Sequence, residues 1–178
     1  MSMRDTLFSL SYFKYEVENW DVKKKEFFNL LNESSQERDE MDFYSSSRRS
    51  NNAICLEKFS NLIFDQLKKF ANELHHSIKI DDVWSVTYHS NDHQTAHNHG
   101  SSGYSGVLYL DFDSNIHEST HFICPWNIPE NDSTYIFTPE VTEGDIFIFP
   151  SFIRHFCPPN KNLKERTIMS FDVSIINN

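Results

Sequence analysis

The stretch Thr95–Leu110, "TAHNHGSSGYSGVLYL", marks a change in the character of the sequence and carries its strongest signal of a site. The chain has only four glycines in 178 residues, and three of them follow His97 and His99 directly: Gly100, Gly103 and Gly106. A pair of histidines two residues apart is a weak signal by itself. Glycines after the pair let the backbone turn sharply and approach another group closely, so the stretch indicates a site.

The same glycines divide the chain by composition. Residues 1–99 contain neither Gly nor Pro, whereas all four glycines and all six prolines lie from Gly100 onward. Helices tolerate neither residue well in their interior, and turns between strands use both. We therefore expect a single domain over residues 1–178, mainly helical in residues 1–77 and rich in strands in residues 78–178.

Two helices are predicted in the first part. Residues 22–32 read as a short helix, and residues 55–77 as one long helix whose apolar residues share a single stripe. We expect this stripe to cover one face of a sheet. The polar residues 33–42 predict an exposed connection, and residues 43–53 predict a loop.

Short strands separated by turn residues are predicted from Ile78 onward. The segments rich in β-branched and aromatic residues are 78–89, 105–112, 119–126, 134–138, 145–151 and 166–176. This pattern favours a β-sandwich or a double-sheet barrel. The apolar run Ile146–Phe149 suits a central strand covered on both faces, and Pro150 should mark a strand end or an edge.

Composition and charge restrict the partners and the compartment. The formal net charge of −10 disfavours a nucleic-acid partner, and we read the small basic segment Ser46–Ser50 as a solvated loop. The chain has three cysteines and no CxxC motif: Cys55, Cys124 and Cys157. We therefore expect no disulfides and a reducing cytoplasm, with each cysteine a small buried apolar residue. We find no signal peptide and no run of eighteen apolar residues, so no membrane span is expected.

Histidine and arginine residues suggest a metal-ion site. On an extended segment, His97 and His99 would point to one face with Cα atoms about 6.5–7 Å apart, close enough to bind one ion. His155 is a candidate third ligand, and Arg166 could lie near it on an antiparallel neighbouring strand, where its guanidinium suits a carboxylate. The alternatives are two surface or hydrogen-bonded histidines and a surface arginine. The other six histidines are not predicted to be ligands: His75, His76, His89, His93, His117 and His121.

Four segments carry a resemblance to a known family: "VWSVTYH", "HNHGSSGYSGVLYL", "EGDIFIFPSFIRH" and "ERTIMSF". Together they resemble a family of small 2-oxoglutarate- and iron(II)-dependent oxygenases known in bacteria and phages. The resemblance covers roughly residues 80–174. It implies an α+β, mainly β fold, namely a cupin-like double-stranded β-helix (jelly roll) with N-terminal helices packed on the larger sheet.

The resemblance also implies the roles of site residues. His97, His99 and His155 would bind Fe(II), although the wider superfamily has Asp or Glu where this chain has His99, and three histidines also suit zinc, nickel or copper. Arg166 would hold the distal carboxylate of 2-oxoglutarate. Tyr88 and Tyr109 are candidates for a hydroxyl on the same carboxylate, with packing in the core as the alternative.

The implied activity is that of a dioxygenase that couples decarboxylation of 2-oxoglutarate to oxidation of an unknown small-molecule or peptide substrate. A cupin-like three-histidine metalloenzyme without 2-oxoglutarate is the first alternative, and a metal-free jelly-roll binding module is the second. A homodimer is compatible with the sequence.

Overall fold

The computed structural model describes residues 9–32, 36–38, 48–50, 54–128 and 130–176. Its helices are α1 (Trp20–Asn32), α2 (Leu56–Leu62) and α3 (Phe64–Leu74). Its strands are β1 (Phe13–Glu16), β2 (Gln36–Arg38), β3 (Arg48–Ser50), β4 (Ser77–Tyr88), β5 (Gln94–His97), β6 (Tyr104–Asp111), β7 (His121–Ile128), β8 (Ser133–Phe137), β9 (Asp145–Pro150), β10 (His155–Cys157) and β11 (Arg166–Ile176).

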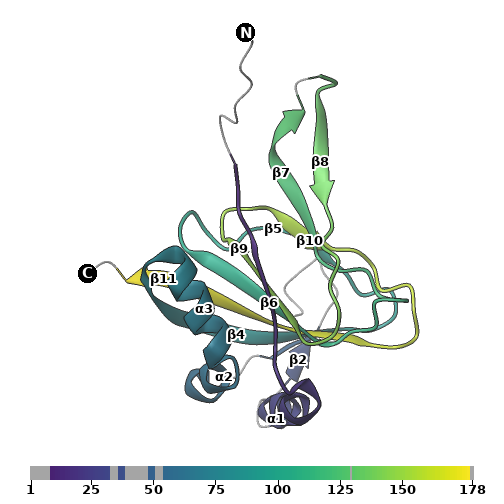
Figure 1. The fold of residues 1–178 in the computed structure, drawn as a ribbon. Helices are drawn as coiled ribbons and strands as arrows, with labels where there is room; N and C mark the ends of the chain where they lie inside the picture. Colours follow the sequence, from purple (N-terminus) through teal and green to yellow (C-terminus); the bar gives the residue numbers. More distant parts are fainter. Residues whose placement is uncertain (1–8, 33–35, 39–47, 51–53, 129, 177–178) are drawn as a thin grey trace.

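The strands form two antiparallel sheets. The larger sheet has the order β1-β9-β6-β11-β4-β3-β2, and the smaller has the order β5-β10-β7-β8. From β4 onward the chain passes back and forth between them: β4, β6, β9 and β11 join the larger sheet, while β5, the β7–β8 hairpin and β10 join the smaller one. This alternation is the predicted double-stranded β-helix (Figure 1).

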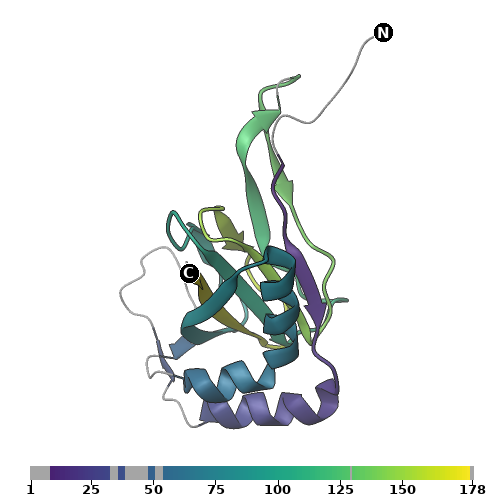
Figure 2. The same cartoon turned by 60° about the vertical axis from the view of Figure 1, so that its left-hand side comes forward.

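The helices pack on the larger sheet, as the family resemblance implied (Figure 2). One apolar core fills this helix–sheet layer, with Phe27 of α1, Phe59 of α2 and Phe70 of α3 fully buried against strand residues such as Met169 and Phe171. Within the described part of the chain, no helix is both long and apolar enough to cross a membrane.

A second apolar core fills the space between the two sheets, and alternation along the strands divides side chains between the cores. In β9, Ile146 and Ile148 face the helices, whereas Phe147 and Phe149 face the smaller sheet. The prediction of a central strand covered on both faces is confirmed. Pro150 is the last residue of β9, as expected for a residue that cannot donate to the ladder.

The first part of the chain differs from the prediction. The stripe over residues 55–77 belongs to two helices, because Ile63 (φ −111°, ψ 20°) leaves the helical backbone region between α2 and α3. Strand β1 pairs with β9, and β2 and β3 extend the larger sheet from within segments expected to be a connection and a loop. Such short strands lack enough alternation to be seen in sequence and exist because an existing sheet edge offers hydrogen bonds to them.

The glycines after the histidine pair allow close approach to β11. Gly103 has φ +81°, and a Cβ there would lie 2.6 Å from the carbonyl oxygen of Val173. A Cβ on Gly106 would lie 2.1 Å from Cζ of Phe171. These two glycines therefore let the start of β6 lie directly against β11, which carries side chains of the candidate site.

The cysteines are free thiols, as predicted, but only Cys157 is buried. Cys124 is half-buried and Cys55 is exposed, so the prediction that each cysteine is buried is wrong for these two. Cys55 directly precedes α2, where its side chain faces solvent rather than the apolar stripe.

Candidate metal centre

Three histidines from the smaller sheet meet at one point between the sheets. His97 ends β5, His99 follows two residues later, and His155 begins β10 directly opposite His97 in the ladder. One nitrogen of each ring lies within 4.8 Å of those of the other two, the geometry of a group that can hold a metal ion. The structure thus brings together the three histidines that the sequence singled out.

Each ring is held through its Nδ1 atom. His97 Nδ1 lies 2.8 Å from the carbonyl oxygen of Thr95, and His155 Nδ1 lies 3.0 Å from that of Ile153. His99 Nδ1 lies 2.9 Å from a carboxylate oxygen of Asp172. A carbonyl or carboxylate can only accept, so each Nδ1 carries a proton and each Nε2 presents a lone pair. Metal-bound histidines are held in this way.

The facing lone pairs favour a cation at the centre. The Nε2 atoms of His97 and His99 are 3.3 Å apart, and with both Nδ1 atoms protonated neither Nε2 has a hydrogen to give the other. A cation between them relieves this repulsion. The donor set therefore fits a resident metal ion such as iron(II).

Burial keeps His155 neutral. Loss of hydration, with a further contribution from neighbouring His97, lowers the pKa of His155 to about 3. Its ring lies among apolar groups, with the Phe149 ring centroid at 4.8 Å and that of Phe122 at 5.8 Å. Trp84 stacks on His99 at 5.3 Å. Aromatic rings thus cover one side of the site and keep His155 in the neutral form that metal binding needs.

Arg166 lies on the facing sheet, so the expected antiparallel pairing with the His155 strand is wrong. β11 pairs with β4 and β6, whereas β10 pairs with β5 and β7. The segment between His155 and Arg166 crosses from one sheet to the other instead of making a hairpin. The Arg166 side chain points between the sheets and reaches β10 there, where it contacts the thiol of Cys157.

The guanidinium of Arg166 is buried without an anion. Only 2 % of the residue is exposed, and its partners are the thiol of Cys157 and the carbonyl oxygens of Glu118 and Pro158. Its Nε has no hydrogen-bond partner, and no carboxylate of the described residues forms an ion pair with it. A buried cation without a counter-charge is unfavourable, so the site suits a carboxylate ligand such as one end of 2-oxoglutarate.

Tyr88 lies beside Arg166 and lines the cavity, whereas Tyr109 lies behind Thr120, which lines it. Tyr88 is the cross-strand partner of Arg166, its ring centroid is 4.4 Å from the guanidinium carbon, and its hydroxyl donates to Gln94. The Tyr109 hydroxyl accepts from the backbone N–H of Thr120. Burial raises the pKa of Tyr109 to about 12 and that of Tyr88 well above its usual range. Both hydroxyls therefore keep the proton that they would donate to a carboxylate.

The space between the histidines and Arg166 is narrow. The cavity lined by the three histidines, Tyr88 and Cys157 offers about 20 Å³ to water-sized molecules, enough for about one water. A dicarboxylate is larger than this space, so its binding requires side chains that line the cavity to move.

Comparison with known families identifies the chain. A family model described as "Putative 2OG-Fe(II) oxygenase" matches residues 82–172, just over half of the chain. The chain belongs to this 2-oxoglutarate- and iron(II)-dependent oxygenase family. The matched range contains the three histidines, Arg166 and both tyrosines. Among the curated proteins, none matches the chain.

Solved structures share the fold of this oxygenase. A prolyl-4-hydroxylase from Pseudomonas putida superposes with a TM-score of 0.64 at 13 % identity, covering 95 % of each chain. HygX from Streptomyces hygroscopicus, with nickel, 2-oxoglutarate and hygromycin B bound, has a TM-score of 0.67 at 10 % identity, with 93 % of this chain and 83 % of that chain covered. The viral collagen prolyl hydroxylase of Paramecium Bursaria Chlorella virus-1 has a TM-score of 0.58 at 13 % identity, with 93 % and 96 % covered.

The oxygenase site also contains residues that the sequence analysis missed. Asp172 binds His99, Ser105 donates to Asp172, and Gln94 accepts from Tyr88. Asp172 stands out in the sequence as the one charged residue of the run Thr167–Ile176, but this does not reveal its partner. Ser105 and Gln94 carry no comparable signal, because their roles depend on contacts between distant segments.

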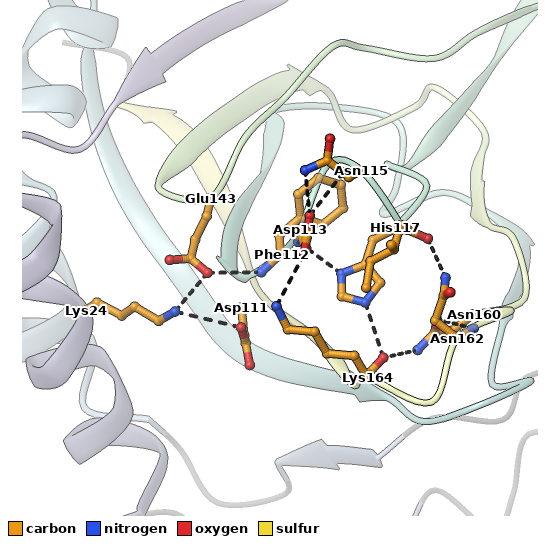
Figure 3. A network of polar contacts seen from close by, with 11 residues as sticks. Lys24, Asp111, Phe112, Asp113, Asn115, His117, Glu143, Asn160, Asn162 and Lys164 are labelled. Carbon is orange, nitrogen blue, oxygen red and sulfur yellow. Dashed lines mark hydrogen bonds and ion pairs between the residues drawn. The ribbon is translucent and has the colours of Figure 1, made fainter.

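Histidines not predicted as ligands have other roles in the oxygenase. His117 is buried, but its Nδ1 accepts from the N–H of Asp113 and its Nε2 donates to the carbonyl oxygen of Lys164 (Figure 3). Through these hydrogen bonds, His117 links the loop after β6 to the loop before β11. His75 ends α3 in a left-handed conformation, and His89 Nδ1 lies 2.6 Å from a carboxylate oxygen of Glu165.

Proposed function

We propose that His97, His99 and His155 hold iron(II) and that Arg166, with Tyr88 and Tyr109, holds 2-oxoglutarate in a dioxygenase that hydroxylates an unidentified substrate. The observation that carries this assignment is the set of three imidazoles whose Nδ1 atoms are engaged and whose Nε2 atoms converge. The buried guanidinium of Arg166, which has no counter-anion, supports the cosubstrate site.

When bound, iron(II) and 2-oxoglutarate supply oxidative chemistry: one atom of O₂ enters succinate as 2-oxoglutarate loses CO₂, and the other atom of O₂ oxidises a substrate C–H bond. The residues of this chain hold and shield these groups. Asp172 accepts a hydrogen bond from Nδ1–H of His99 and so keeps the Nε2 lone pair directed at the ion. Arg166 orients a carboxylate, and Phe149 and Trp84 exclude water.

The substrate is a small molecule or a peptide in this proposal. The acidic chain disfavours nucleic acid, and the structural relatives include prolyl hydroxylases and an enzyme with hygromycin B bound. Three unpaired cysteines support a reducing cytoplasm as the compartment.

Anaerobic titration tests the function directly. Iron(II) followed by 2-oxoglutarate should produce a charge-transfer band in the visible spectrum with one equivalent of each, and His155→Ala should lose both the iron and the band. Iron binding without a band would contradict the 2-oxoglutarate site and favour the three-histidine metalloenzyme. Failure to bind any divalent ion would leave only the metal-free binding module.

A further inference from the structure

A pocket larger than the cavity at the histidines opens beside the β7–β8 hairpin. It has a volume of about 290 Å³ and is lined by the residues just before β1, by both strands of the hairpin and by β9. The outer end of the hairpin projects beyond the rest of the two sheets, and the residues from 9 onward that lead into β1 lie beside the hairpin (Figures 1 and 2). Its volume is close to the lower end of small-molecule sites, about 300–1,000 Å³.

The lining of this pocket selects an uncharged aromatic group. Half of its lining residues are aromatic, among them Tyr12, Phe122, Trp126, Tyr135, Phe137 and Phe149, and most of the others are apolar. No Asp, Glu, Lys, Arg or His of the described residues lines it. A charged group would lose its hydration there without gaining a partner, whereas an aromatic ring gains apolar burial and ring contacts.

Exposed aromatic surface on the hairpin points to the same ligand. Trp126 is 47 % exposed and Tyr135 is 54 % exposed, although both are large apolar residues that line the pocket. Contiguous apolar surface of this kind marks binding sites in soluble proteins. Tyr and Trp suit a ligand with an apolar body, because each combines a large ring with one polar atom.

A layer of packed rings separates the pocket from the metal site. Tyr12 stacks on Phe147 at 4.7 Å, Phe147 contacts Phe122 at 5.0 Å, and Phe122 contacts Phe149 at 4.7 Å. Phe149 also lines the cavity of the three histidines, and its ring lies 4.8 Å from that of His155. A molecule anchored in the pocket therefore lies one aromatic ring away from His155.

We propose that this pocket is the anchor subsite for the primary substrate, and that the substrate is a small molecule carrying an uncharged aromatic ring system. This inference rests on the proposed function, because it takes the three histidines as the place of reaction. The pocket holds the aromatic part, and the ring of Phe149 turns aside so that the rest of the substrate extends toward the histidines. A cavity of about 150 Å³ already binds benzene, so about 290 Å³ suits one or two rings.

A matched pair of fluorescent probes tests the subsite. N-phenyl-1-naphthylamine is neutral, and 8-anilinonaphthalene-1-sulfonate has the same ring systems with one negative charge. Each is titrated into the full chain, with and without Mn(II) and 2-oxoglutarate. The neutral probe should bind at least tenfold more tightly than the sulfonate. Trp126→Ala and Tyr135→Asp should weaken the neutral probe at least tenfold.

Ile136 supplies the control on the same strand. It is 46 % exposed and adjacent to Tyr135 but does not line the pocket, so Ile136→Asp should change the affinity less than twofold. Equal binding of the two probes, or equal loss in Ile136→Asp and Tyr135→Asp, would overturn the proposal. Affinity that falls as protein concentration rises would also overturn it, because a second copy would then occupy the pocket.

The two proposals fail separately. Probe binding without metal or 2-oxoglutarate does not depend on the reaction, so a missing charge-transfer band with intact probe binding contradicts only the proposed function. Conversely, a normal band with no probe binding contradicts only the anchor subsite. In the loaded protein, the neutral probe should also change the charge-transfer spectrum of wild type and leave that of Trp126→Ala unchanged.

Discussion

His99 and Asp172 form a hydrogen-bonded pair, with Nδ1 and Oδ1 2.9 Å apart, and the same carboxylate oxygen accepts from the Ser105 hydroxyl at 2.7 Å. Under the proposed assignment, His99 takes the place of the carboxylate that binds the metal in the wider oxygenase superfamily. Asp172 then supplies a carboxylate that does not touch the metal and acts through the imidazole of His99. Its negative charge strengthens the Nε2 lone pair of His99 as a ligand.

Asp172→Asn tests this pair by removing the charge and keeping an oxygen that can accept from His99. We expect Co(II) to bind about 10- to 100-fold more weakly, the range found when such outer partners of metal ligands are lost. Competition with a chromophoric chelator measures the affinity without turnover. Asp111→Asn is the matched control, because both carboxylates are 32 % exposed and Asp111 pairs with Lys24 instead. Equal Co(II) affinity in both variants would refute the role.

Arg166→Met should separate anchoring of 2-oxoglutarate from structural support. Replacing a buried cation that has no counter-anion by an apolar side chain of similar length should change the free energy of unfolding by no more than about 1–2 kcal/mol. The stabilisation by 2-oxoglutarate with Mn(II), about 2.7 kcal/mol at 100 times Kd in wild type, should disappear. Thermal unfolding with and without the ligand measures both effects.

Arg154→Met is the control for Arg166→Met. Arg154 is an exposed arginine whose guanidinium donates to the carbonyl oxygen of Ala96. We expect this variant to keep the full shift with 2-oxoglutarate. If Arg166→Met keeps it as well, Arg166 is not the anchor.

The sequence predicted which three histidines come together, but not the connection between β10 and β11 that places Arg166. His97, His99 and His155 could be identified because few residue types bind metals and because these three lie at glycine-rich or proline-flanked turns. Their convergence depends on the β5–β10 ladder, which places His155 opposite His97. The place of Arg166 was wrong because the spacing between two strands does not reveal whether the connection is a hairpin or a crossing between sheets.

Other features of the fold could not be predicted for a different physical reason. β1 is a four-residue strand that is ordered by its pairing with the edge of β9, and Ile63 interrupts a continuous apolar stripe without any Gly or Pro. The role of Asp172 could be recognised only from the structure, in which β11 brings its carboxylate to Nδ1 of His99. In each case the tertiary neighbour, rather than the local sequence, determines the structure.

Gly106→Ala tests the close approach of β6 to β11. The added methyl group would lie 2.1 Å from the ring of Phe171, which is fully buried between the helices and the sheet. Overpacking of this kind costs about 1–3 kcal/mol, so we expect the denaturant midpoint to fall without a change in slope. Phe171→Leu in the same chain should recover part of the loss. Strictly additive effects of the two substitutions would contradict direct contact.

His117 should make stability depend on pH through the loop contacts in Figure 3. Burial lowers the pKa of His117, and the positive charges of Arg166 and Lys164 add to the effect, whereas the hydrogen bond to the carbonyl oxygen of Lys164 and the charge of Asp113 oppose it. Between the lowered folded pKa and the unfolded value near 6.5, the unfolded chain binds more protons, so stability falls as the pH decreases through this window. Urea unfolding between pH 7.5 and 5 should show a shallower decrease for His117→Gln than for wild type, with exposed His76→Gln measured in parallel as the control for losing one histidine. An unchanged pH dependence in His117→Gln would show that the imidazole is not held neutral by its burial between Asp113 and Lys164.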